Sequence, residues 1–137
     1  MMKIEFYKDG SKKAINPVLF SGFAQKAAGE VAKAGQVTTK DGKTKLEQNK
    51  RTQIRKFYDE VVRLNSDVKN KTNDWDTVFP FVNMLIAKTT YAYGRKLVTK
   101  EFLDMMNVCV SQIEKPEDLD VFCNFFEAFM GFYKQYE

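Results

Sequence analysis

The C-terminal end of the chain carries an aromatic stripe that constrains the fold more than any other feature. Its members follow one another at intervals of 3, 4, 3, 4 and 3 residues: Leu119, Phe122, Phe126, Phe129, Tyr133 and Tyr136. This spacing places six large apolar side chains on one face of an α-helix. Lys115 and Pro116 precede the stripe, and proline is favoured in the first turn of a helix. A face of this size must be buried, so the rest of the chain has to provide a core around it.

A second apolar row widens the same helix: Val121, Phe125, Ala128 and Phe132. Two interpretations follow. The helix crosses the centre of a bundle and both rows are covered within the chain, or one row meets another subunit.

The helical period recurs in four further segments. The first starts near Asn16 and Pro17 and stops at Gly35, and the second runs from about Glu47 to Asn65. A polar connection covers residues 66–76 and includes Trp75. The third helix, from about Thr77 to Tyr93, is apolar nearly all round and is therefore predicted to be central. The fourth follows Thr99, a candidate cap, and extends through Ile113.

These segments predict an all-α fold, a compact bundle of about five helices in one domain spanning residues 1–137. Residues 1–15 are predicted to be a flexible lead-in, and residues 34–47 a mobile basic loop. No alternating run of strand length is convincing. The alternative is the same bundle with a short N-terminal strand.

The composition limits the kinds of catalytic and metal-binding site that the chain can form. The chain has no histidine, which removes the commonest general base and the usual transition-metal ligand. Cys109 and Cys123 lie among apolar residues at helical spacing and are predicted to be buried thiols, with a disulfide as the alternative. We therefore expect no catalytic residues, no metal and no cofactor. No apolar run is long enough to span a bilayer and no signal peptide is evident, so a cytoplasmic protein is expected.

Two other patterns favour structural explanations. Gly42-Lys43-Thr44 resembles the end of a phosphate-binding loop, but that motif needs a glycine at position 37, which is Val37 here. The acids near Asp74 and Asp118 lie where helices are predicted to begin. Carboxylates at such positions stabilise the positive end of a helix, which is a simpler role than metal binding.

Positive charge is concentrated in the first hundred residues. Residues 1–100 carry a net charge of +10 and residues 101–137 a net charge of −6, while the segment from Lys40 to Lys56 alone carries +5. Such asymmetry suits an anionic partner, or contacts between copies of the chain. Within the second helix, Arg51 and Arg55 share a face. The alternative is a solvated face, because Arg55 and Asp59 are spaced to form an ion pair.

The third helix carries a more specific basic pattern. Lys88, Tyr91 and Arg95 lie at i, i+3 and i+7, and no acid occurs between Thr77 and Lys100. Cations without nearby acids and with an aromatic between them suit phosphates and exposed bases. The alternative is that Lys88 and Arg95 extend from a buried helix to reach water.

At these residues the sequence resembles the Csm-type small subunit of type III-A CRISPR RNA-guided effector complexes. The resemblance is carried by residues 52–61 (TQIRKFYDEV) and residues 80–95 (PFVNMLIAKTTYAYGR), which follow the family's order. It returns near the C-terminus in Asp118-Leu119, in the FFEAF motif at 125–129 and in Tyr133-Lys134. Thr89-Thr90 depart from the family's small apolar residues at that point. Residues 1–47 carry little of the resemblance.

The resemblance implies a non-catalytic, all-helical subunit that binds and stabilises guide RNA and the target RNA paired with it, in antiviral defence. It implies RNA, other subunits and copies of itself as partners. Carried over residue by residue, it marks one RNA-binding set: Gln53, Arg55, Lys56, Lys88, Tyr91 and Arg95. Of these, Arg55, Lys88 and Arg95 are expected to contact phosphates. Neighbouring basic residues complete the set: Lys50, Arg51 and Lys96.

Two other functions remain open at this point. One is a protein-only helical adaptor or oligomerisation module that docks a partner through the aromatic C-terminal helix. The other is an enzyme, for which the sequence offers no catalytic set.

Overall fold

Five α-helices form the body of the protein in the residues that the structure, a computed structural model, describes, which are 2–8 and 14–136. Their bounds are α1 Ala24–Gly35, α2 Arg51–Lys69, α3 Trp75–Gly94, α4 Lys100–Val110 and α5 Pro116–Tyr133. A π-helical turn, Leu19–Phe23, leads into α1, and a 3₁₀ turn, Lys134–Tyr136, follows α5. The predicted all-α bundle is confirmed.

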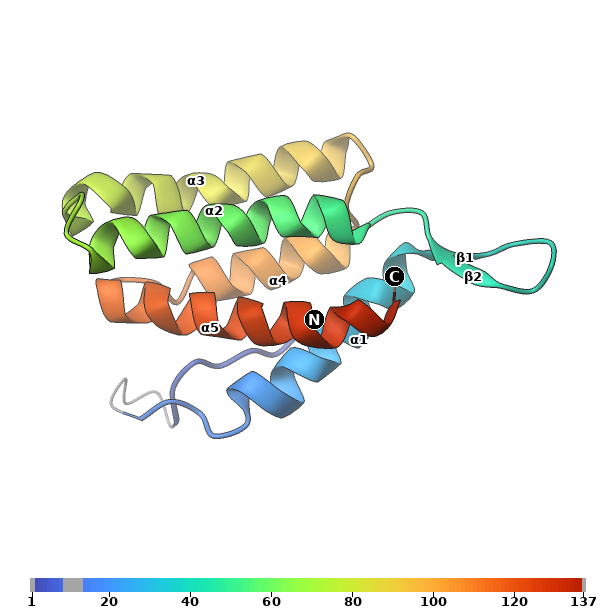
Figure 1. The fold of residues 1–137 in the computed structure, drawn as a ribbon, viewed down its shortest axis with the longest axis horizontal. Coiled ribbons are helices and arrows are strands. Elements are labelled where there is room, and N and C mark those ends of the chain that lie inside the picture. The colour runs from blue at the N-terminus through green and yellow to red at the C-terminus, as the bar shows by residue number, and fades with distance from the viewer. Residues whose placement is uncertain (1, 9–13, 137) are drawn as a thin grey trace.

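The helices enclose one core (Figure 1). Helix α5 packs between α1 and α2, α2 also packs against α3, and α4 closes the ring by contacting α3 and α1. Several boundaries differ from the sequence expectation: α1 starts only at Ala24, after the π-helical turn, α2 continues to Lys69, and α4 ends at Val110. Helix α2 starts at Arg51, later than predicted, while α3 starts already at Trp75 because the Asp74 carboxylate accepts a hydrogen bond from the backbone N–H of Thr77 at 2.9 Å.

Helix α5 supplies the centre of this core. Phe122, Phe126, Phe129 and Tyr133 are fully buried, and their rings follow one another at centroid distances of 5.7, 5.7 and 5.2 Å. From the second row, Phe125 is also fully buried. The interpretation that α5 crosses the bundle centre is therefore confirmed for this part of the helix. Offset and edge-on contacts between aromatic rings add to the stability gained by burying their area.

Helix α3, in contrast, is not central, and the prediction from its apolar composition is wrong. It packs mainly against α2 and α4, so its remaining surface faces solvent. Its buried residues form one narrow row: Val78, Val82, Leu85, Thr89 and Ala92. On the outer side Phe81 is 50% exposed, Met84 47% and Tyr91 67%. An apolar sequence predicts burial only where neighbouring elements exist on every side.

Part of the N-terminal segment packs against the bundle. Ile4 and Phe6 are buried, and the Phe6 ring stacks on Phe122 at 6.3 Å. The Phe6 backbone N–H donates to Oε1 of Gln112 at 3.0 Å, while Nε2 of Gln112 donates to the Ile4 carbonyl at 2.7 Å. Two apolar residues two apart put both side chains on one face of extended backbone. A pattern of two apolar residues is too short to identify in the sequence. Residues 9–13 of the predicted lead-in lie outside the described residues.

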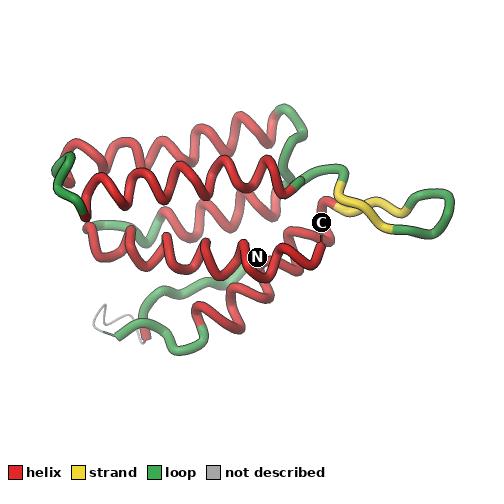
Figure 2. The backbone as a smooth tube through the Cα atoms, in the orientation of Figure 1, coloured by secondary structure: helices red, strands yellow, loops and turns green. Residues whose placement is uncertain are grey.

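The segment predicted to be a basic loop contains a β-hairpin that projects from one end of the bundle (Figure 2). Strand β1, Gln36–Thr38, pairs antiparallel with β2, Thr44–Leu46. In the turn, Gly42 adopts φ +83°, and Asp41 accepts hydrogen bonds from the Thr39 hydroxyl and the Lys43 N–H. Strands of three residues are too short to show an alternating pattern, so the sequence gives no sign of them. Mobility of the segment stays a prediction.

Asn49 joins the hairpin to the bundle and is fully buried. Its Nδ2 donates to the Val31 carbonyl at 2.9 Å and to the Thr99 hydroxyl at 2.7 Å, and its Oδ1 accepts from the Thr99 N–H at 2.8 Å. Its backbone N–H donates to the Leu97 carbonyl, and its carbonyl accepts from the Tyr133 hydroxyl at 2.6 Å. Asn49 thus joins α1, α5 and the α3–α4 connection to the start of α2. The side chain of Thr99 makes no capping hydrogen bond to α4, contrary to the sequence prediction, and bonds to Asn49 instead.

Replacing Asn49 by alanine should lower the free energy of unfolding by about 3 kcal/mol or more, measured by urea denaturation. The change removes the hydrogen bonds of the Asn49 side chain to the Val31 carbonyl and to the hydroxyl and N–H of Thr99, all in a buried setting. It also places alanine at φ 56°, a left-handed conformation that glycine and asparagine adopt more readily. The control is Asn107→Ala, at an exposed position of α4, where alanine should change stability by no more than about 0.5 kcal/mol. Similar stabilities for the two variants would contradict a structural role for the Asn49 junction.

Candidate nucleic-acid interface

A groove between α2 and α3 brings together five of the residues marked in the sequence. They are Gln53, Lys56, Lys88, Tyr91 and Arg95. The groove has a volume of about 490 Å³, and its other lining residues are Phe57, Glu60, Leu85, Ala92 and Leu97. Its apolar members are buried or half-buried, whereas Lys56, Lys88, Tyr91 and Arg95 are exposed. The groove is therefore an apolar trough with cations along its sides.

Helical spacing explains this gathering. Gln53, Lys56 and Glu60 recur every three or four residues along one face of α2, and Lys88, Tyr91 and Arg95 do the same along α3. Packing of α2 against α3 sets the two rows opposite each other. The Asn49 junction fixes one end of the trough, because Asn49 bonds to the carbonyl of Leu97, which lines the groove.

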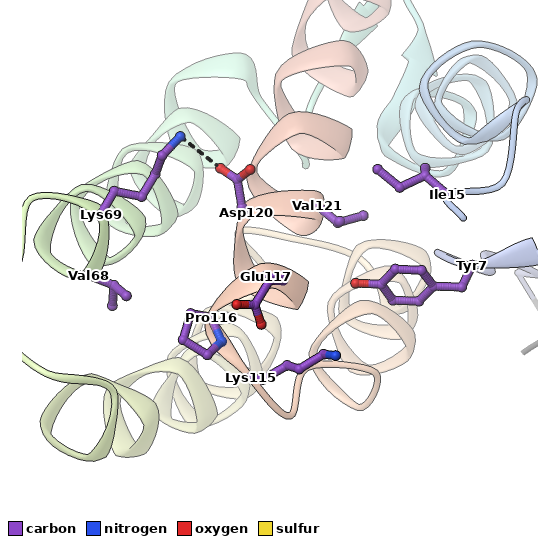
Figure 3. Close-up of a pocket in the computed structure, with 9 residues that line it drawn as sticks. All are labelled: Tyr7, Ile15, Val68, Lys69, Lys115, Pro116, Glu117, Asp120 and Val121. Carbon is purple, nitrogen blue, oxygen red and sulfur yellow. Dashed lines mark hydrogen bonds and ion pairs between the residues drawn. The ribbon is translucent and has the colours of Figure 1, made fainter. Parts of the chain in front are cut away.

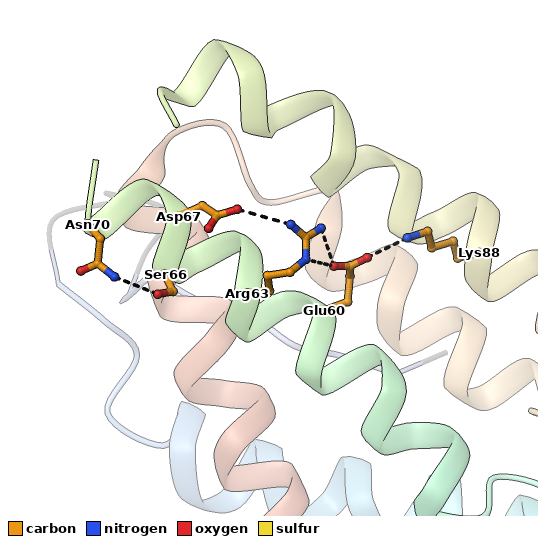
Figure 4. Close-up of polar contacts among 6 residues, drawn as sticks. All are labelled: Glu60, Arg63, Ser66, Asp67, Asn70 and Lys88. Carbon is orange, nitrogen blue, oxygen red and sulfur yellow. Dashed lines mark hydrogen bonds and ion pairs between the residues drawn. The ribbon is translucent and has the colours of Figure 1, made fainter. Parts of the chain in front are cut away.

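Lys88 has an acidic partner, contrary to the expectation from its own helix. Its Nζ lies 2.7 Å from Oε2 of Glu60, across the groove (Figure 4). Glu60 also pairs with Arg63 at 2.6 Å, and Arg63 reaches Asp67 at 3.3 Å. No acid lies near Lys88 along α3, and its partner Glu60 lies on α2, so the pair cannot be identified from the spacing within one helix. The spacing of Lys56 and Glu60 allows an ion pair within α2, yet Glu60 turns to Lys88 and Arg63 instead.

The pKa of Glu60 reflects these partners. Partial burial raises the pKa of this carboxyl, but hydrogen bonds from Lys88 and Arg63 and their positive charges lower it further than burial raises it. The net pKa lies below the usual value for glutamate. Glu60 therefore stays ionised at neutral pH and offsets one of the three cations that line the groove.

Tyr91 and Arg95 form the outer rim at one end of the groove. The Arg95 guanidinium lies 5.8 Å from the centroid of the Tyr91 ring, within range of a cation–π contact. The next residue, Lys96, has φ 62° and ends α3: its N–H donates to the Tyr93 carbonyl and that of Leu97 to Ala92, both at 3.0 Å. An exposed lysine thus occupies the left-handed position that glycine usually takes, two residues after Gly94, the last residue of α3.

The remaining sequence-marked residues lie outside the groove. Arg55 points away from it along α2 and pairs with Asp59 at 3.6 Å. Lys50 and Arg51 line a separate hollow at the base of the hairpin, together with Lys45. The structure thus separates the marked set into groove residues, hairpin-base residues, Arg55, and Lys96 just after the end of α3.

A third hollow lies between the N-terminal segment and α5 (Figure 3). It has a volume of about 560 Å³, and its lining includes Tyr7, Lys69, Lys115, Glu117 and Asp120. Lys69 pairs with Asp120 at 3.2 Å, and burial together with the nearby Asp118 raises the pKa of Tyr7 above its usual range. Two cations and two acids line this hollow, so it gives an anionic ligand no net attraction.

The cysteines and acids take structural positions. Cys109 is buried, and burial raises the pKa of its thiol; Cys123 is half-buried, and both thiols are free. The Asp118 carboxylate accepts hydrogen bonds from the backbone N–H groups of Glu114 and Lys115 where α5 begins. Within the described residues, no three acidic, cysteine or histidine side chains are placed to hold a metal ion. No helix of the described residues is long and apolar enough to cross a membrane.

Comparison with protein families decides the identity of the chain. A family model described as Csm2 Type III-A matches residues 25–137, which include all of the five helices except the first residue of α1, together with the hairpin and the groove. The chain belongs to the Csm2 family. The resemblance of its sequence to small subunits of type III-A CRISPR effector complexes is thereby confirmed. Searches of curated proteins and of solved structures gave no match.

As a Csm2-family small subunit, this chain is a structural component of a multisubunit complex. The match leaves out residues 1–24, so the N-terminal segment docked on Gln112 and Phe122 lies outside the matched region.

The ion pair across the groove predicts a pH-dependent contribution to stability. Because the pKa of Glu60 is lowered on folding, its stabilising effect is present above the unfolded value of about 4.5 and is lost as pH falls below it. Glu60→Gln should therefore be less stable than the wild type at pH 7, by at most about 1 kcal/mol given the exposure of Lys88, and the difference should be smaller at pH 4, below the unfolded pKa of Glu60.

Urea denaturation at both pH values measures this difference. Lys88→Met keeps the aliphatic stem and removes the partner, so adding it to Glu60→Gln should cost less than the sum of the two single changes. Strict additivity would show that the pair makes no contribution.

Proposed function

We propose that the α2–α3 groove binds the sugar–phosphate backbone of the guide RNA and the target RNA in the effector complex. The observation that carries the proposal is the convergence of Lys56, Lys88 and Arg95 from two helices on one groove, with Tyr91 exposed beside them. The role is to bind and stabilise RNA, without catalysis and without a cofactor.

The charge balance of the groove supports this role. Lys56, Lys88 and Arg95 outnumber Glu60, so the groove has a net positive charge. When a phosphate approaches, Lys88 can keep its contact with Glu60 and still direct N–H groups outward, because an ammonium group has three donors. The guanidinium of Arg95 can contact two phosphate oxygens at once.

The groove suits recognition of backbone rather than of base sequence. Cations bind phosphates of any sequence, and an A-form duplex is recognised chiefly through phosphates, 2′-hydroxyls and shape. Tyr91 adds an exposed aromatic face on which an unpaired base can stack. A single copy is expected to bind weakly, and several copies along one RNA would bind it together much more tightly.

A second candidate function is a protein-only adaptor. The surface that favours it lies on α3, whereas the sequence suggested the aromatic helix α5. The aromatic rows of α5 are largely covered, while Phe81 and Met84 on α3 are half-exposed. These side chains suit a contact with another subunit, including another copy of the chain. The two functions use different parts of α3 and are compatible.

The first test is the charge reversal Lys56→Glu/Arg95→Glu. Binding of a 20-nucleotide single-stranded RNA, followed by fluorescence anisotropy, should weaken at least tenfold, and wild-type binding should weaken as salt rises. The variant must keep its helical circular-dichroism signal. Lys3→Glu/Lys26→Glu makes the same change in net charge at exposed positions away from the groove and should bind within about threefold of the wild type.

Arg55→Glu separates the groove from the sequence-based assignment. Arg55 lies outside the groove and pairs with Asp59, so its reversal should weaken binding less than reversal of Arg95 alone. Equal binding by the wild type and the Lys56/Arg95 variant would contradict the proposed groove. Absence of wild-type binding at low salt would favour the adaptor function.

A further inference from the structure

The β1–β2 hairpin is a projecting ribbon with almost no apolar surface. It extends from the end of the bundle, away from the helices (Figure 1). Its exposed side chains are mainly threonines and lysines: Thr38, Lys40, Lys43, Thr44 and Lys45, with Val37 as the one large apolar exception among them. A two-stranded ribbon with so little burial gains little stability of its own. Burial in the core therefore does not explain why the chain forms this hairpin.

The base of the ribbon is held firmly to the bundle. The Gly35 carbonyl accepts hydrogen bonds from the N–H groups of Glu47 and Gln48, at 2.8 and 3.2 Å. A Cβ atom on Gly35 would lie 2.2 Å from the Gln48 carbonyl oxygen, so the closure depends on glycine. The next residue, Asn49, is locked in the buried junction. The hairpin thus leaves the bundle from a fixed point.

A hollow of about 350 Å³ lies at this base. Its lining combines three cations and three hydroxyl-bearing residues with one apolar residue, Leu46: Lys45, Lys50, Arg51, Thr44, Thr52 and Tyr136. Within the described part of the chain, Lys40, Lys43, Lys45 and Lys50 make no ion pair, and the carboxylate of Asp41 is engaged in the turn. Cations beside hydroxyl groups are the side chains that contact phosphate oxygens most often.

The hollow and the groove are neighbours along one helix. Lys50 and Arg51 stand at the first turn of α2, and Gln53, in the groove, follows within one turn. Lys56 lies about 8 Å further along the helix axis than Arg51, at 1.5 Å per residue. Lys50, three residues before Gln53, lies on the groove side of α2, whereas Arg51 shares a face with Arg55, away from the groove. The positive surface therefore continues from the groove to the hairpin through Lys50.

We propose that the hairpin and the hollow at its base form a second phosphate-binding surface, onto which the RNA strand held in the α2–α3 groove continues. The inference deepens the proposed function and rests on it for the nature of the ligand. A protein partner fits this surface less well, because lysine is depleted and apolar side chains are enriched at the centres of protein interfaces. A backbone of regularly spaced phosphates matches lysines spread along a ribbon.

The test compares the salt dependence of RNA binding among matched variants. Lys43→Ala/Lys45→Ala removes two cations from the hairpin, Lys56→Ala/Arg95→Ala two from the groove, and Lys3→Ala/Lys26→Ala two from elsewhere on the surface. Each binds the same 20-nucleotide single-stranded RNA between low and moderate salt. Each lost phosphate contact lowers the slope of log K against log salt by about 0.7. The slope measured for the hairpin variant should therefore be less steep than that of the wild type by about 1.4, and the slope of the control variant should be unchanged.

The outcomes separate the two proposals. A hairpin variant with the wild-type slope, beside a groove variant with a reduced slope, overturns the hairpin surface and leaves the groove intact. A reduced slope for the hairpin variant alone overturns the groove and the continuous track. No wild-type binding at low salt overturns both. Sedimentation of the free proteins provides a further check: a hairpin variant whose oligomeric state changes while its RNA affinity does not would make the ribbon a protein contact.

Discussion

The buried side chain of Asn49 is the constraint on which the rest of this structure depends. It bonds to α1 through Val31 and to the start of α4 through Thr99, and its backbone bonds to Leu97 and Tyr133. Hydrogen bonds in a buried setting are directional and costly to leave unmade, so they specify one arrangement of the elements they join. That arrangement sets the ends of α2 and α3 beside each other and fixes the exit of the hairpin.

Stability and recognition are divided between different helices. Helix α5 provides the aromatic core, and α1, α2 and α4 cover it. Helix α3 buries one narrow row and keeps its outer side in solvent, which leaves Lys88, Tyr91 and Arg95 available beside α2. Substitutions along the outer side of α3 should therefore alter binding with little cost to folding, whereas α5 tolerates little change. The proposed RNA surface is a product of this division.

Helical periodicity could be identified in the sequence wherever the signal is local. The stripe of α5 and the row Lys88, Tyr91, Arg95 depend on spacing within one helix, and the structure places both as the spacing predicts. The pairing of Lys88 with Glu60 could not be found this way, because it depends on how two helices pack. Ile4 and Phe6 form too short a pattern to show that this segment packs against the core. The position of Arg55 outside the groove likewise depends on which face of α2 packs against α3.

The central claim is that RNA lies in the groove between α2 and α3. Photo-crosslinking of the protein to single-stranded RNA containing 4-thiouridine, with the attachment sites located by mass spectrometry, tests it most directly. Adducts should concentrate at Tyr91 and within residues 53–60, and should fall when Lys56 and Arg95 are replaced. Adducts confined to the outer surfaces of α1 and α5, with none in the groove, would contradict the account.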